Sequence, residues 1–86
     1  MTFQAAIIKE QGVIFTVVVV KSHVIAPGSA RNNMVAAMSN YFRTSVVLMA
    51  QDHRGRASFW GRPDLVRFLA RVPVGALPWR KISTAA

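Results

Sequence analysis

The side chains best suited to chemistry in this chain are its arginines, because a guanidinium group contacts phosphate through two parallel hydrogen bonds and also stacks on bases. Residues 43–86 hold eight basic and two acidic residues, a surplus of six, whereas residues 1–42 hold three basic and one acidic residue, a surplus of two. A small domain with such a surplus of positive charge attracts polyanions over long range. The residues predicted to contact nucleic acid are Arg54, Arg56, Arg62, Arg67, Arg71, Arg80 and Lys81.

Aromatic residues lie among these basic ones, a mixture that is typical of surfaces that bind single-stranded nucleic acid. Phe59 and Trp60 are adjacent on an expected strand, and Trp79 precedes Arg80. Neighbouring strand residues point to opposite faces, so we expect one of Phe59 and Trp60 in the core and Trp60 as the exposed stacking residue. Large aromatic side chains also fill cores and protein interfaces, and that alternative stays open.

Acid–base or metal chemistry has few candidates, namely Asp52 with His53, and Asp64. Hydrolytic sites commonly need at least two carboxylates or a metal cluster. Pro63-Asp64 resembles the opening of the Pro-Asp…(Asp/Glu)-x-Lys pattern of metal-dependent nucleases, but no acidic residue follows Asp64. The Asp52-His53 pair has no partner at ligand spacing. We therefore expect no catalytic residues and no metal, the alternative being a site shared across a dimer.

Motifs for cofactors and for membranes are also missing from the sequence. The five glycines match no phosphate-binding loop, so we expect no cofactor. The lack of cysteine excludes a disulfide framework and fits a reducing compartment. The longest nearly apolar run, residues 13–20, is much shorter than the roughly 20 residues of a membrane span. No basic segment leads into an apolar stretch at the start, and we expect a cytoplasmic chain.

The first half of the chain is predicted to contain two strands and a helix. Residues 3–8 read as a strand followed by a turn over 9–12, and the β-branched run 13–20 reads as a central strand buried on both faces. After the break at 26–28, Ser29 is a good N-cap for a helix over 30–41. The side chains expected on its inner stripe are Ala30, Met34, Ala37, Met38 and Tyr41.

The second half is predicted to begin with a buried strand at 45–50, so that two strands and the helix between them form a right-handed crossover with parallel pairing. Residues 51–56 read as a hairpin loop with Gly55 in the left-handed conformation, and 57–60 as the return strand. Pro63 and Asp64 favour a helix start, and Pro73 ends the helix. In the alternative that the basic residues only form a solvated face, Asp64 pairs locally with Arg67.

The whole pattern predicts a single α+β domain over 1–86, with the order ββαββα, a four-stranded mixed sheet and two covering helices. Residues 73–86 are expected to form an extended tail or an edge strand. The chain is 52% hydrophobic and only 16% charged, against about 25% charged in typical domains. Such an apolar excess favours a surface covered by another chain, and therefore a homo-oligomer, most simply a homodimer.

Two functions fit these observations. The first is a small non-catalytic module that binds nucleic acid or another polyanion through an arginine-rich face, with little sequence specificity. The alternative is a protein–protein interaction, inhibitor or accessory module whose basic face meets an acidic protein. If the hairpin loop and the second helix lie on one side, their arginines would form one continuous surface.

Overall fold

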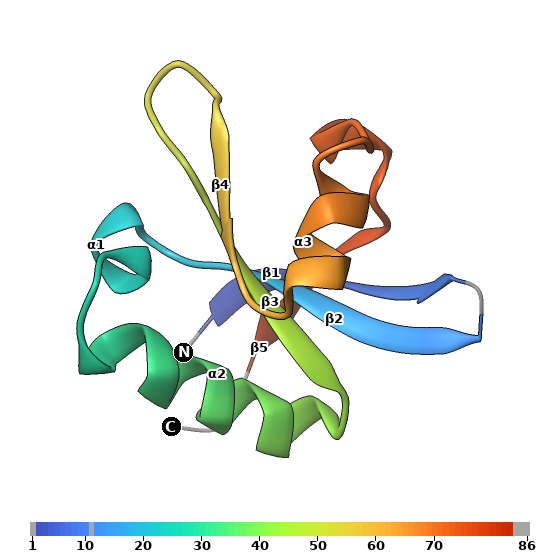
Figure 1. Ribbon diagram of the computed structural model, residues 1–86, viewed down its shortest axis with the longest axis horizontal. Coiled ribbons are helices and arrows are strands. Elements are labelled where there is room, and N and C mark those ends of the chain that lie inside the picture. The colour runs from blue at the N-terminus through green and yellow to red at the C-terminus, as the bar shows by residue number, and fades with distance from the viewer. Residues whose placement is uncertain (1, 11, 84–86) are drawn as a thin grey trace.

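The chain folds into a mixed β-sheet with helices on both faces (Figure 1). A computed structural model describes residues 2–10 and 12–83. The described strands have the order β4-β3-β2-β1-β5 across the sheet. They are β1 (Thr2–Glu10), β2 (Val13–Val19), β3 (Ser45–Gln51), β4 (Ala57–Trp60) and β5 (Trp79–Ser83). The helical segments are α1 (Ser22–Ile25), α2 (Ser29–Phe42), α3 (Pro63–Leu69) and a 3₁₀ turn, η1 (Val74–Ala76).

The α+β class and the mixed sheet are confirmed, whereas the expected four strands and two helices are wrong. The sheet has five strands within the described residues, because Trp79–Ser83 pairs antiparallel with β1. The short α1 adds a helix between the predicted strand 13–20 and the predicted break at 26–28, a segment to which the sequence assigned no structure. Residues 1 and 11, the latter in the predicted turn, and 84–86 in the predicted tail lie outside the described residues. None of the described helices is long and apolar enough to cross a bilayer.

The predicted crossover is present in the centre of the sheet. Strands β2 and β3 are parallel, with Val17 opposite Val47, and α2 lies between them in the chain. Both valines are fully buried. Branching at Cβ suits the pleated backbone, and burial on both faces explains why the strand is a continuous apolar run rather than an alternating one.

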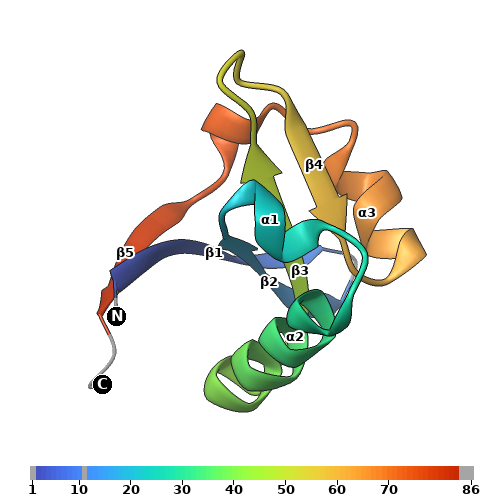
Figure 2. The ribbon, with the colours of Figure 1, turned by 90° about the vertical axis from the view of Figure 1, so that its left-hand side faces the viewer.

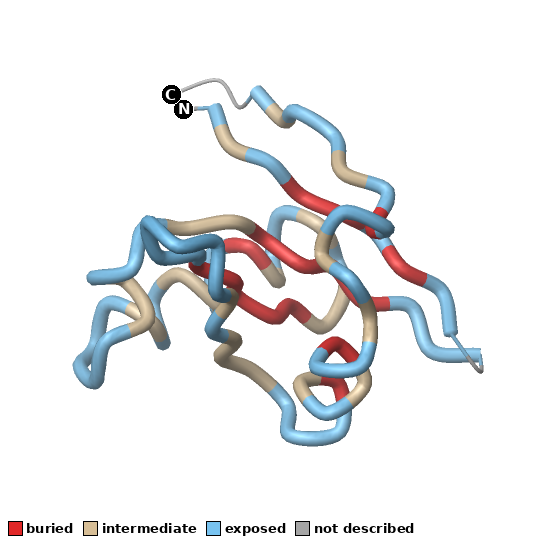
Figure 3. The backbone as a smooth tube through the Cα atoms, turned by 90° about the horizontal axis from the view of Figure 1, so that it is seen from above, coloured by how far each residue is buried: buried red, intermediate tan, exposed pale blue. Residues whose placement is uncertain are grey.

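Alternate residues of each strand pack into two separate cores, one on each face of the sheet. The face covered by α3 and η1 includes Phe15, Val17 and Leu69, whereas the face covered by α1 and α2 includes Val18, Met38 and Leu48. Figure 2 shows α2 and α3 on opposite sides of the strands. In Figure 3 the buried segments lie at the middle of the central strands and along α3.

The rotation of α2 differs from the predicted one. Met34 and Met38 face the sheet as expected, but Val35 and Phe42 accompany them, whereas Tyr41 is 51% exposed. The helix has apolar residues on both sides of its inner stripe, so its pattern alone does not fix the rotation. The Phe42 ring meets Phe3 of β1 edge to face, with 6.2 Å between centroids. The N-cap is also Gly28, with φ 146°, and not Ser29.

Gly61 follows β4 where the backbone passes close to β3. A Cβ atom at this position would lie 3.0 Å from Val47 Cγ2, 3.1 Å from Val47 Cα and 3.2 Å from the Val46 carbonyl oxygen. Backbone atoms cannot rotate away, so we expect Gly61→Ala to lower the free energy of unfolding by about 1–3 kcal/mol in a urea titration. Gly75→Ala is the matched control, because a Cβ there meets no atom within 4 Å. Equal urea midpoints for the two variants would contradict this prediction.

Candidate nucleic-acid interface

The seven predicted basic contacts are all exposed, but they belong to three separate parts of the fold. Arg54 and Arg56 lie in the loop between β3 and β4, and Arg80 and Lys81 lie on β5. Strands β4 and β5 are the two opposite edges of the sheet. The remaining three, on one face between these edges, are associated with α3: Arg62, Arg67 and Arg71.

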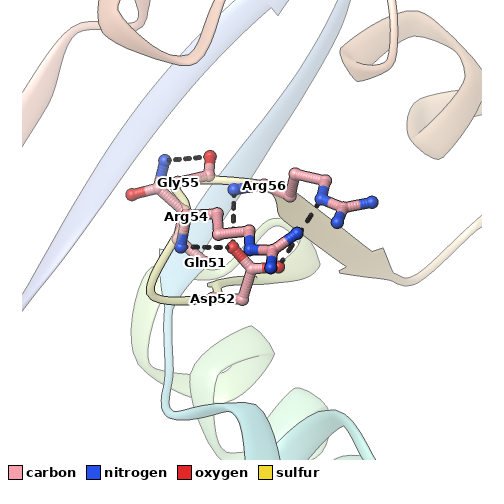
Figure 4. Close-up of polar contacts among 5 residues, drawn as sticks. All are labelled: Gln51, Asp52, Arg54, Gly55 and Arg56. Carbon is pink, nitrogen blue, oxygen red and sulfur yellow. Dashed lines mark hydrogen bonds and ion pairs between the residues drawn. The ribbon is translucent and has the colours of Figure 1, made fainter.

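The β3–β4 loop holds its shape through the Asp52 carboxylate (Figure 4). Asp52 Oδ1 accepts hydrogen bonds of 2.9 Å from the backbone N–H groups of both Arg54 and Arg56. The Gly55 N–H donates to the Asp52 carbonyl at 2.9 Å, and φ of Gly55 is 82°, which confirms the predicted left-handed position. Gln51 Nε2 also donates to the Gly55 carbonyl at 3.1 Å. The loop conformation is therefore stabilised by hydrogen bonds among its own residues.

Asp64 pairs with Arg62, and not with Arg67 as in the alternative of a solvated face. Arg62 Nε and its terminal amino group donate to the two carboxylate oxygens at 3.1 and 2.7 Å. These hydrogen bonds hold the pKa of Asp64 below its ordinary value and raise the pKa of Arg62. The stability that Asp64 contributes is therefore present at neutral pH and is lost as the pH falls below the ordinary aspartate range.

Helix α3 begins at Pro63 as predicted, but it ends at Leu69, well before Pro73. Arg71 consequently lies in the turn after the helix. Arg67 and Arg71 nevertheless line one surface hollow of about 300 Å³, together with Asp64 and Phe68. The predicted proximity of these two arginines is thus retained.

The aromatic residues occupy both faces of the sheet. Phe59 packs against the core under α3 and Trp60 against the core under α2, so the expectation that only one would be in a core is wrong. The guanidinium carbon of Arg31 lies 3.6 Å from the Trp60 ring centroid. Trp79 is half-buried, and its Nε1–H donates to the Val74 carbonyl at 2.8 Å.

Arg31 is a residue that the sequence reasoning missed. It precedes Met34, Val35 and Met38 at helical spacing, which is the signal that could have placed it on the inner stripe of α2. Its stacking on Trp60 occupies one face of that ring. Base stacking on Trp60 therefore stays a prediction, and it requires the other face or the displacement of Arg31.

The acidic residues neutralise little of the positive surface. Asp52 contacts Arg56, with 3.8 Å between a carboxylate oxygen and Nε, and Asp64 contacts Arg62. Within residues 2–10 and 12–83 the remaining predicted contacts have no acidic partner at ion-pair distance, namely Arg54, Arg67, Arg71, Arg80 and Lys81. This group is called the unpaired cations below.

The candidate acid–base residues do not converge within the described chain. Asp52 precedes β4 and Asp64 follows it, so the strand separates the two carboxylates, and each is held by a nearby arginine. Among the residues that the structure describes, no three histidine, aspartate or glutamate side chains gather as metal ligands. The arrangement can bind anions through guanidinium groups. No family model, curated protein or solved structure was found to match this chain.

Proposed function

We propose that this chain is a non-catalytic module that binds nucleic acid through phosphate contacts. The observation that carries the proposal is the set of unpaired cations, all exposed and without an acidic partner in the described residues. An arginine already held by a carboxylate must give up that contact to bind phosphate, whereas an unpaired one does not. The full chain carries a formal net charge of +8 at pH 7, which favours encounter with a polyanion.

Phosphate contacts supply affinity without reading the base sequence. The unpaired cations lie on a loop, on α3 with its following turn and on an edge strand, which is a distribution suited to following a backbone around a small domain. We therefore expect similar affinities for oligonucleotides of different sequence and equal length.

The test is a titration of fluorescent oligonucleotides with the protein, followed by anisotropy at several salt concentrations. Each phosphate neutralised releases counterions, so log K is expected to fall with log salt at about 0.7–0.9 per contact. Engagement of the five unpaired cations predicts a total slope near −3.5 to −4.5. Failure to bind both single-stranded and duplex oligonucleotides at about 50 mM salt would contradict the proposal.

A second candidate, self-association, is favoured by a different surface. On the α2 face of the sheet, Ile7 and Ile14 are diagonal neighbours on β1 and β2, and they are 55% and 50% exposed. A neighbouring surface hollow of about 310 Å³ is lined by Ile7 together with Phe42, Pro78 and Ile82. Exposed apolar side chains that adjoin in this way are typical of surfaces covered by another chain.

The measurement for the second candidate is sedimentation of the intact protein and of its Ile7→Lys variant. A homodimer that uses this surface is expected to become monomeric in the variant. A wild-type protein that sediments as a monomer at all concentrations would count against it.

A further inference from the structure

The loop between β3 and β4 combines a fixed shape with an exposed tip. Residues 51–56 are all exposed, and Figures 1 and 2 both show the loop extending beyond the helices at the end of a two-stranded ribbon. The tip carries His53, Arg54 and Arg56. In Figure 4 the side chains of Arg54 and Arg56 extend in the same direction. The chain thus presents two guanidinium groups on a narrow projection.

The fixed shape of this loop has a thermodynamic consequence for binding. Two backbone N–H groups and the Arg56 side chain all contact the Asp52 carboxylate, so the loop is held by contacts among its own residues. A loop that is ordered in advance loses less conformational entropy when it binds. Asp52 also brings a negative charge close to the arginines, which opposes phosphate binding by simple charge attraction. Its position is therefore explained better by the loop conformation than by the net charge.

A narrow two-stranded projection matches one kind of nucleic acid in particular. The major groove of B-form DNA is about 12 Å wide and admits a β-ribbon, whereas the major groove of A-form RNA is deep and too narrow for side chains to read. A single strand has no groove. Acceptor atoms line the DNA major groove at every base pair, so arginines can donate there without demanding one sequence.

We propose that the β3–β4 loop enters the major groove of duplex DNA, where Arg54 donates to acceptors at the base edges. Arg56 donates there through its terminal amino groups, because only its Nε lies near Asp52. The inference rests on the proposed nucleic-acid binding and names the form of nucleic acid that this loop selects. The other unpaired cations hold the flanking phosphates and treat all nucleic acids alike. The loop thus distinguishes B-form DNA from A-form RNA and from single strands, and the unpaired cations outside the loop provide most of the overall affinity.

The test compares duplex DNA, duplex RNA and single-stranded DNA of one sequence by anisotropy, with two variants of Asp52. Asp52→Asn removes the negative charge but keeps an oxygen that accepts the two N–H groups, so a preference for duplex DNA of roughly tenfold is expected to persist. Asp52→Ala removes both the charge and the acceptor. Although its net charge is higher, we expect it to lose the preference for duplex DNA.

Matched arginine variants keep the test decisive if a loop variant changes the fold. Arg54→Ala is expected to lose the preference for duplex DNA, whereas Arg67→Ala, which removes the same charge beside α3, is expected to weaken binding to all three probes equally. If Asp52→Ala and Arg54→Ala keep the wild-type order of preference, the loop proposal is overturned and nucleic-acid binding stands. If the wild-type protein binds none of the three probes, the proposed function fails as well.

Discussion

Reversing the charges of Arg54, Arg67 and Arg71 to glutamate together is expected to weaken oligonucleotide binding by about 100-fold or more at low salt. None of the three has an acidic partner in the described residues, so the change breaks no ion pair there. Three cationic contacts with the nucleic acid disappear, and each introduced carboxylate also repels the phosphate backbone. The slope of log K against log salt is expected to become shallower by about two to three. Anisotropy titrations of the two proteins measure both effects.

The matched control replaces the same three arginines with lysine, which keeps the charge and loses the planar fork. We expect this variant to bind within a few-fold of the wild-type protein, with an unchanged salt slope. A glutamate variant that binds as tightly as the lysine variant would refute the role of the unpaired cations. The oligomeric state of both variants is expected to match the wild type, because the exposed apolar residues Ile7 and Ile14 are unchanged.

Replacing Phe15 with alanine is expected to remove a large part of the stability of the fold. Phe15 lies on β2 with 1% of its surface exposed, and its ring meets Phe68 of α3 edge to face at 6.2 Å between centroids. Truncation of a buried phenylalanine lowers the free energy of unfolding by about 3–5 kcal/mol. A chain of this length has only about 4–13 kcal/mol in total. Urea unfolding followed by circular dichroism measures the loss.

Ile14→Ala provides the control for this loss on the same strand. Ile14 precedes Phe15 but points to the opposite face, where it is half exposed. Its truncation is expected to change the free energy of unfolding by about 0.5 kcal/mol or less. If the two variants lower the free energy of unfolding by similar amounts, Phe15 and Ile14 are not on a buried and an exposed face of β2, and the prediction is wrong.

The central part of the fold could be predicted because its signals are local. The run of β-branched residues over 13–20 indicates a strand buried on both faces, and the helix between two such runs indicates parallel pairing. Gly55 and Pro63 mark a turn and a helix start through backbone preferences of their own. Each of these inferences depends on residues that are close together in the sequence, and each is confirmed.

The errors concern choices that distant residues decide. The rotation of α2 depends on the contact between Phe42 and Phe3, which lies on a strand at the other end of the sequence. The sequence left open whether residues 73–86 form a tail or an edge strand, because the answer depended on an open edge of β1. Trp79–Ser83 forms the edge strand. Asp64 had basic residues two and three positions away, and spacing alone did not select Arg62.

The candidate site was predictable in composition but not in arrangement. Charge identifies Arg54, Arg67 and Arg80 as exposed, because an arginine is rarely buried without a partner. The sequence placed the cations in the hairpin loop, the second helix and the tail, but it did not show that β4 and β5 are opposite edges of the sheet. The shape of the 51–56 loop depends on two hydrogen bonds to one carboxylate oxygen, and a general hairpin pattern does not specify them.

The pairing of β1 with β5 determines how long the edge of β1 stays exposed while the chain is being synthesised. Thr2 of β1 lies opposite Ser83 of β5, so the sheet is complete only when the last strand has been made. Until then β1 presents an unpaired edge rich in apolar residues, which is the kind of edge that recruits strands from other chains. When β5 docks, the new edge carries Arg80 and Lys81, and charged side chains discourage such pairing. Arg80 and Lys81 are therefore placed where charged side chains disfavour pairing with strands of other chains, a role separate from any contact with a polyanion.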